Sequence, residues 1–290
     1  MKHLWCGLWA LVGCLCFWSS QVRAEPPMWV IRDQDSTIVL FGSVHVLPPG
    51  DEWRTAALME ALATTDEVWF EIPFTDVSRA EIARRVGAGA LLPRGQTLSA
   101  RLQPQTAERL QRVAGGLGLY MPGLERLQPW MAEVILSLAA DHRAGGRPDD
   151  GVERRINAEL PATVPRLAFE TVAQQMDSLS GASEAGQIAA LTETLREMEE
   201  DPGNFERIVA NWRSGDLATL EDVALAPMRR ASPEVYDRLI VRRNQLWSEA
   251  ISLRLGGSGR SVMIVGVGHL IGPQGVPALL RARGIAVEGP

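Results

Sequence analysis

Two short motifs near opposite ends of the chain contain the residue types best suited to chemistry. Gly42-Ser43-Val44-His45 follows the apolar run Val39-Leu40-Phe41, and Gly266-Val267-Gly268-His269 follows Met263-Ile264-Val265. An apolar, β-branched run that ends at glycine predicts a buried strand entering a tight turn. Glycine can adopt positive φ and lets neighbouring groups approach the backbone closely, so Gly42 and Gly266 are expected to shape the binding site. Each histidine would then lie just beyond the end of a strand.

Histidine is scarce in this chain, so its presence at the end of both motifs is informative. The chain has four histidines; His3 precedes the folded part, and His142 fits a structural role near the end of a predicted helix, where a cation suits the helix dipole. A neutral imidazole is a frequent ligand of divalent transition metals. His45 and His269, completed by a carboxylate, would leave a metal position open for water. We therefore predict one divalent metal site that uses both.

Carboxylates and one cation are placed to complete such a site. Glu71 ends the strand predicted from residue 67 and could act as a metal ligand or as the general base. Glu170 ends a second, shorter candidate strand, and its role is left open. Arg243 and Asn244 open a predicted helix, and a guanidinium there would suit an oxyanion or a substrate carboxylate. A surface ion pair is the competing interpretation for Arg243.

The elements around these residues predict an α/β fold with a central sheet. Residues 28–32 and 37–41 form a predicted hairpin, and Asp51 is expected to cap a helix over 52–63 before the strand at 67–72. Strand, helix and strand recur over residues 260–265, 273–283 and 285–288. The chain therefore contains two βαβ-like units, each with a strand that ends in Gly-x-x-His. Because parallel strands end at one sheet edge, His45 and Glu71 are expected to leave the sheet together.

Between the two units the pattern is mainly helical. Residues 74–165 show helical periodicity with proline and glycine at the expected helix ends, and we interpret them as a large insertion. Helices resume over residues 171–256. No linker or low-complexity tract divides residues 25–290, which favours a single domain.

The N-terminal segment, residues 1–24, has the anatomy of a secretory signal. Lys2 precedes the apolar stretch Leu4 to Trp18, and a small-residue cleavage site ends at Ala24. The stretch is short for a membrane span, so no span is expected after cleavage. We predict a periplasmic or secreted protein. As the alternative, Leu11-Val12-Gly13-Cys14 resembles a lipoprotein box, and acylation of Cys14 would anchor the protein to a membrane.

Charge and cysteine content exclude some types of catalytic group, metal ligand and partner. All three cysteines precede the expected cleavage site at Ala24, so the mature chain would have no thiol catalyst or thiolate ligand. The whole chain has a net charge of −6, and loss of Lys2 and Arg23 takes it to about −8. This argues against a nucleic-acid partner.

An ordered set of residues resembles the TraB/GumN family, which is related to the Tiki proteins. The set comprises Gly42 to His45, Glu71, Gln128-Pro129-Trp130, Phe169-Glu170-Thr171, Arg243-Asn244 and Gly266 to Leu270. The resemblance implies a fold similar to erythromycin esterases and ChaN-like proteins. It also implies a manganese- or cobalt-dependent protease site centred on His45 and His269. One departure is Glu153 in Gly151-Val152-Glu153, where an aspartate is expected.

The leading hypothesis is an exported metal-dependent hydrolase, peptidase-like, acting on a peptide or protein substrate. His45, His269 and Glu71 would bind manganese, cobalt or zinc, with Arg243 and Asn244 in support. Two alternatives remain open at this point. One is a non-catalytic protein that holds a metal, a metallo-cofactor or a peptide in the same crevice, and the other is a metal-free esterase with a histidine base.

Overall fold

The structure, a computed structural model, describes residues 25–290. The predicted signal peptide and the lipoprotein-type Cys14 lie outside the described residues. Within residues 25–290, no helix has both the length and the apolar character needed to cross a membrane.

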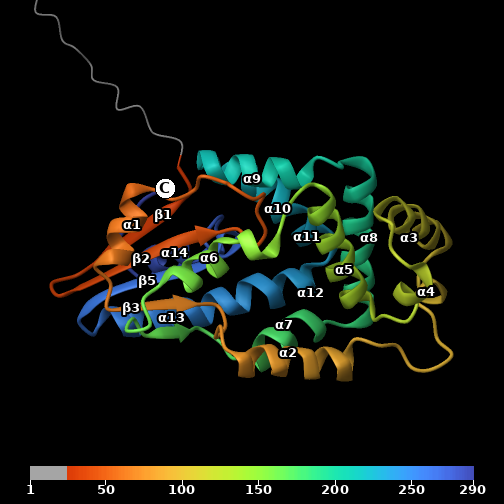
Figure 1. Ribbon diagram of the computed structural model, residues 1–290, viewed down its shortest axis with the longest axis horizontal. Coiled ribbons are helices and arrows are strands. Elements are labelled where there is room, and N and C mark those ends of the chain that lie inside the picture. Colours follow the sequence, from red (N-terminus) through yellow and green to blue (C-terminus); the bar gives the residue numbers. More distant parts are fainter. Residues whose placement is uncertain (1–24) are drawn as a thin grey trace, which may run out of the picture.

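A six-stranded, mostly parallel sheet forms the centre of the fold (Figure 1). Its strands are β1 (Met28–Arg32), β2 (Ser36–Ser43), β3 (Glu67–Phe70), β4 (Arg166–Ala168), β5 (Gly259–Gly266) and β6 (Val287–Glu288). The spatial order is β4-β3-β5-β2-β1-β6. The pairs β4–β3, β3–β5 and β5–β2 are parallel, whereas β1 is antiparallel to both of its neighbours.

The register of β2 against β5 places the two Gly-x-x-His motifs at one edge of the sheet. Gly42 is opposite Val265, and Ser43 is opposite Gly266, so both strands end at the same level. Both strands are almost entirely buried over their second halves, which explains why their sequences are apolar on both faces. The two motifs are far apart in the sequence, but they are neighbours in the fold because parallel strands align their carboxyl ends.

Helices make up most of the rest of the fold. The longer ones are α1 (Ala56–Ala63), α2 (Asp76–Gly89), α3 (Pro104–Leu117), α5 (Pro129–Arg143), α6 (Val152–Glu159), α7 (Val172–Ser180), α8 (Glu184–Glu200), α9 (Asn204–Ser214), α10 (Leu217–Ala224) and α13 (Arg242–Leu255). The shorter ones are α4 (Met121–Leu124), α11 (Ala226–Ala231), α12 (Pro233–Tyr236) and α14 (Val276–Ala282). A π-helical turn, Asp237–Val241, leads into α13.

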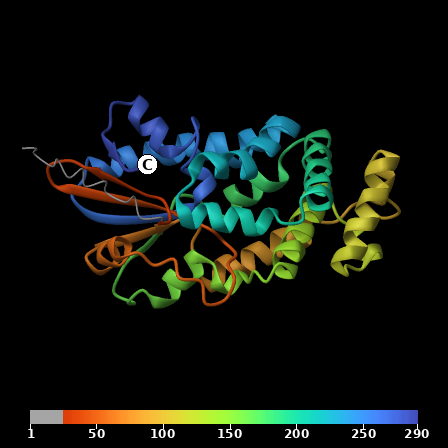
Figure 2. The ribbon, with the colours of Figure 1, turned by 90° about the horizontal axis from the view of Figure 1, so that it is seen from above.

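These helices cover both faces of the sheet and extend far beyond one end of it. Figure 2 shows α13 and α14 on one side of the strands and α1 and α6 on the other, with α3 and α4 farthest from the sheet. The main hydrophobic core surrounds the sheet and includes Phe41, Phe70 and Met263. A second cluster, with Leu110 and Leu136, joins α3, α5 and α8. The helical region therefore has hydrophobic packing of its own.

The prediction of a mixed α/β protein with a central sheet and many helices is confirmed. The predicted hairpin is present, because β1 pairs with β2 from Met28–Phe41 to Arg32–Thr37. Within residues 71–165 the described chain has helices and two isolated bridges but no named strand. The duplication of a βαβ unit stays a prediction; the outer strands of the two expected units, β3 and β6, pair with β5 and β1 respectively.

The predicted start of the first helix is wrong. The helix begins at Ala56, and its cap is Thr55, whose hydroxyl accepts a hydrogen bond of 3.1 Å from the Leu58 amide. Asp51 instead forms an ion pair with Arg213 at the end of α9. Asp51 therefore pairs with an arginine that is distant in the sequence, whereas the local pattern predicted that it would cap the helix.

Candidate functional site

Three side chains from separate parts of the chain meet beyond the ends of β2 and β3. One ligand atom from each of His45, Glu71 and Glu153 lies within 4.8 Å of the other two. The imidazole Nδ1 of His45 is 2.7 Å from Oε1 of Glu153, and its Nε2 is 3.9 Å from Oε1 of Glu71. The two carboxylates are buried, whereas the His45 side chain is 63% exposed. The group therefore lies at the surface end of a buried acidic site.

The start of α6 brings Glu153 to this group. The Val152 amide donates to the carbonyl of Val44 over 3.1 Å, which docks the helix onto the loop of the first motif. A Cβ on Gly151 would overlap the carbonyl oxygen of His45, so only glycine fits there. Glu153 then lies in the first turn of α6, where the helix dipole favours a carboxylate. Its Oε1 also accepts a hydrogen bond from the Ser43 hydroxyl.

Glycine is required at position 266 because neighbouring side chains approach its backbone closely, and not because of its backbone angles. Its amide donates to Oε1 of Glu71 over 2.8 Å. A Cβ at this position would lie 3.1 Å from Nε2 of His45 and 3.2 Å from Oε1 of Glu71. Neither Gly42 nor Gly266 has positive φ. The glycine of the second motif thus gives both Glu71 and the His45 ring room beside the strand end.

Arg243 holds two buried carboxylates and one imidazole together. Its Nη2 donates to Glu71 and to Glu170, in each case over 2.6 Å. Its Nε donates to Glu170 over 3.0 Å, and its Nη1 donates to the Leu239 carbonyl over 3.1 Å. Nη1 also lies 2.9 Å from Nε2 of His269. All five guanidinium N–H groups therefore have acceptors within the protein, and none is left for a substrate carboxylate.

The network around His269 determines its tautomer. Because arginine can only donate, Nε2 of His269 accepts from Arg243, and the ring proton must lie on Nδ1. Nδ1 donates to Oδ1 of Asn244 over 2.7 Å, and the Asn244 amide donates to the Gln274 carbonyl over 2.7 Å. Trp247 packs against the imidazole with ring centroids 4.4 Å apart. His269 is thus a fixed, neutral ring.

The π-helical turn before α13 precedes the two adjacent residues that face His269. Arg243 and Asn244 are both buried, and they contact opposite nitrogens of the same ring. The Leu239 carbonyl, which accepts from Arg243, belongs to this turn. Single π-helical turns within α-helices are frequent at functional sites. The π-helical turn therefore lies next to Arg243 and Asn244, the two consecutive residues that form hydrogen bonds with the His269 ring.

Burial and neighbouring charges shift the pKa values of the carboxyl groups and imidazoles in this site. Burial alone would raise the pKa of Glu71, but the Arg243 guanidinium, the charged His45 ring and the hydrogen bond from the Gly266 amide hold it well below the usual range for a carboxyl. Burial raises the pKa of Glu170 despite its contact with Arg243. The negative charge of Glu153 raises the pKa of His45 to about 9, whereas burial lowers that of His269 to about 3. At neutral pH the His45 ring is therefore positively charged in the metal-free chain, whereas the His269 ring is neutral.

The sequence-predicted residues are brought together, but in two groups. His45 and Glu71 lie with Glu153, while Arg243, Asn244 and His269 form the adjoining network, in which Nε2 of His269 is 3.9 Å from Oε1 of Glu71. His269 is not among the three donors that lie together, and its Nε2 accepts from Arg243. From the sequence, Glu153 was noted only as a departure from the family pattern, and no role in the site was predicted for it. Its signal was the glycine two residues earlier, at the start of a helix.

The fold and this site define a mixed α/β protein with a histidine–glutamate cluster at the carboxyl end of its parallel strands. A family model for the TraB/PrgY/gumN family matches residues 27–289, and the chain belongs to that family. The chain is similar to the "Uncharacterized protein YbaP" of Escherichia coli (strain K12), with 25% identity over 244 residues. That match covers 83% of this chain and 87% of YbaP, and the Shigella flexneri protein of the same name gives the same values. No solved structure gave a significant match.

Proposed function

We propose that this protein is an exported metal-dependent hydrolase that acts on peptides or proteins. His45, Glu71 and Glu153 would hold a divalent cation such as manganese, cobalt or zinc. The observation that carries the proposal is the convergence of three donor atoms within 4.8 Å from three separate segments of the chain. Imidazole nitrogen with carboxylate oxygen is a donor set that suits these metals.

The charge of the site supports the proposal. Glu71, Glu153 and Glu170 bring three carboxylates, and Arg243 is the cation that contacts two of them. With His45 neutral, as metal binding requires, the group has an excess of negative charge that a divalent cation would balance. In the metal-free chain, protonation of His45 partly takes the place of that cation, consistent with its pKa of about 9.

The chain's own residues have separate tasks in this scheme. A bound divalent metal would supply Lewis acidity and lower the pKa of a water molecule. Glu153 orients the His45 ring through Nδ1, and Arg243 keeps Glu71 ionised and oriented. Because Arg243 has no free donor, we assign it to orienting Glu71 and not to binding substrate. His269 and Asn244 hold Arg243 in place from the other side.

Metal binding by the full chain after signal removal tests the proposal. Equilibrium dialysis against Mn²⁺, Co²⁺ and Zn²⁺ is expected to give one tight site in the wild type. His45→Ala should weaken it by more than about 100-fold, since a direct ligand matters more than an outer-shell partner. His142→Ala is the matched control, because His142 is exposed on α5 and belongs neither to this cluster nor to the Arg243 network, so affinity should stay unchanged. Equal metal binding by wild type and His45→Ala would overturn the assignment.

Turnover separates the proposed hydrolase from the two alternatives. A mixture of unstructured peptides, analysed by mass spectrometry with and without chelator, should be cleaved only when metal is present. Tight metal binding without cleavage of any peptide would favour the binding protein. Undiminished ester hydrolysis in chelator, lost in His45→Ala, would favour the metal-free esterase.

A further inference from the structure

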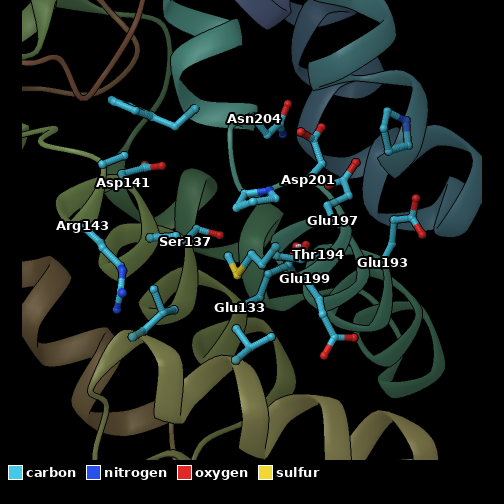
Figure 3. Close-up of a pocket in the computed structure, with 18 of the residues that line it drawn as sticks. Glu133, Ser137, Asp141, Arg143, Glu193, Thr194, Glu197, Glu199, Asp201 and Asn204 are labelled. Atoms are coloured by element: carbon cyan, nitrogen blue, oxygen red, sulfur yellow. Dashed lines mark hydrogen bonds between the residues drawn. The ribbon is translucent and has the colours of Figure 1, made fainter.

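A large cavity lies in the helical region, outside the histidine–glutamate cluster. It is bounded mainly by α3, α5, α8 and α9 and has a volume of about 720 Å³ (Figure 3). That volume lies within the range of small-ligand pockets, roughly 300–1,000 Å³. No residue of the histidine–glutamate cluster or the Arg243 network lines it. The cavity is therefore available for a separate task.

Three of the carboxylates that line the cavity form no ion pair in the described part of the chain, whereas Glu193, Glu199 and Asp201 pair with arginines. Among residues 25–290, neither Glu133 nor Asp141 of α5 nor Glu197 of α8 forms an ion pair, and Glu133 accepts one hydrogen bond of 2.9 Å from Thr194. Figure 3 shows Asp141 on one side of the cavity and Glu197 on the other. Burial raises the pKa of Glu133 and of Glu197 to about 7 and that of Asp141 to about 6. Such groups would gain from a cation placed between them.

The arginines that line the cavity do not supply this cation. Arg112 donates to Glu199 through Nε over 2.8 Å, at the exposed rim. Arg143 donates to the carbonyl of Gly116. Both cations are thus already engaged by the protein, and neither forms an ion pair with Glu133, Asp141 or Glu197.

The cavity also has an apolar side that leads toward the candidate metal site. Phe205 lines the cavity, and the side chains of Phe205 and Val46 both approach Gly146 closely. A Cβ on Gly146 would lie 2.7 Å from Cζ of Phe205 and 2.7 Å from Cγ1 of Val46. Val46 directly follows His45. The loop of the first Gly-x-x-His motif therefore lies beside one wall of the cavity, with Gly146 packed between them.

We propose that this cavity is a specificity subsite that receives a lysine side chain of the peptide acted on at the histidine–glutamate cluster. The aliphatic stem would pack along the Phe205 side, and the ammonium group would donate to the carboxylates of α5 and α8. A lysine ammonium has three donors on a flexible stem, which suits acceptors from two helices. This inference rests on the proposed function for its substrate, but not for its binding measurement.

Binding by the metal-free full chain after signal removal tests the subsite without any hydrolysis. The probes are a blocked alanine peptide with one central lysine, its twin with norleucine in place of lysine, and pentylamine as a free ammonium. At low ionic strength, calorimetry should give a Kd for the lysine peptide at least about tenfold lower than for the norleucine twin. Pentylamine binding in addition would show that the ammonium alone is sufficient; binding of the peptide without pentylamine would assign the site to a peptide lysine.

A pair of variants locates the site. Glu133→Gln combined with Glu197→Gln should remove the preference for lysine over norleucine while the chain stays folded. The control, Glu60→Gln, makes the same type of substitution on the exposed face of α1, away from the cavity, and should keep the preference. Equal binding of the two peptides by the wild type, or an unchanged preference in the double variant, would overturn the subsite. Lysine-selective binding without cleavage would leave the subsite standing and count against the hydrolase.

Discussion

The guanidinium of Arg243 donates to Nε2 of His269 over 2.9 Å, and this contact separates the two histidines that the sequence pairs. His269 becomes a neutral acceptor, held from its other nitrogen by Asn244. His45 keeps its Nε2 free of such a donor and faces Glu71. Two copies of one motif thus provide different chemistry: one an exposed imidazole among carboxylates, the other a buried support for an arginine.

Replacement of Arg243 should destabilise the fold strongly. Arg243→Lys keeps the charge but cannot make five directed hydrogen bonds, so Glu71, Glu170 and His269 lose partners while buried. Leaving buried charges without partners costs roughly 3–5 kcal/mol, and we expect a loss of at least about 2 kcal/mol in urea unfolding. Arg242→Lys is the control, because Arg242 is 63% exposed and pairs with Asp237. Its effect should stay below about 1 kcal/mol.

Gly266→Ala should damage the site more than the fold. The new methyl group would press on Nε2 of His45 and Oε1 of Glu71, 3.1 and 3.2 Å away, and displace one of them. Metal affinity is expected to fall by about tenfold or more, with a smaller change in the unfolding midpoint. Gly115→Ala provides the contrast, since a Cβ there meets nothing within 4 Å on α3 and should stabilise the helix by about 0.5–1 kcal/mol. Unchanged metal affinity in Gly266→Ala would argue against the proposed metal position.

The stability of the protein should fall between about pH 4.5 and pH 7 because of Glu133. Burial raises its folded-state pKa to about 7 from 4.5, so in this range the unfolded chain has released the proton that the folded chain still holds. The folded state therefore loses relative stability as pH rises through this window. Glu133→Gln removes the titrating group, and the variant should match the wild type near pH 4.5 but exceed it by roughly 1–3 kcal/mol at pH 8. A constant difference at both pH values would contradict this assignment.

The N-terminus of the mature protein tests the predicted export. If the segment that ends at Ala24 is a cleaved signal, mass spectrometry of the exported protein should show a chain beginning at Glu25. A lipid-modified N-terminal Cys14, lost in Cys14→Ser, would instead support the membrane-anchored alternative. Recovery of the intact chain with Met1 from the cytoplasm would contradict both.

Local pattern alone was enough for the central sheet and for part of the candidate site. Val39 to Phe41 and Met263 to Val265 are apolar runs closed by glycine, and this signal lies within a few adjacent residues. It correctly indicated two buried strands, each followed by a histidine, and the pairing of β2 with β5 places their ends level with each other. Glu71 was predictable for the same reason, as the residue after a buried strand.

Contacts between distant segments decided the rest. Glu153 accepts a hydrogen bond from the hydroxyl of Ser43, 110 residues away in the sequence. Glu170 accepts one from Arg243, 73 residues away. The sequence around Arg243 shows a polar residue at a helix start, equally suited to a substrate carboxylate or to a surface ion pair. Asp51 likewise reads locally as a helix cap but pairs with Arg213. A carboxylate or guanidinium takes whichever partner the packing brings within reach, and only the tertiary structure determines which partner that is.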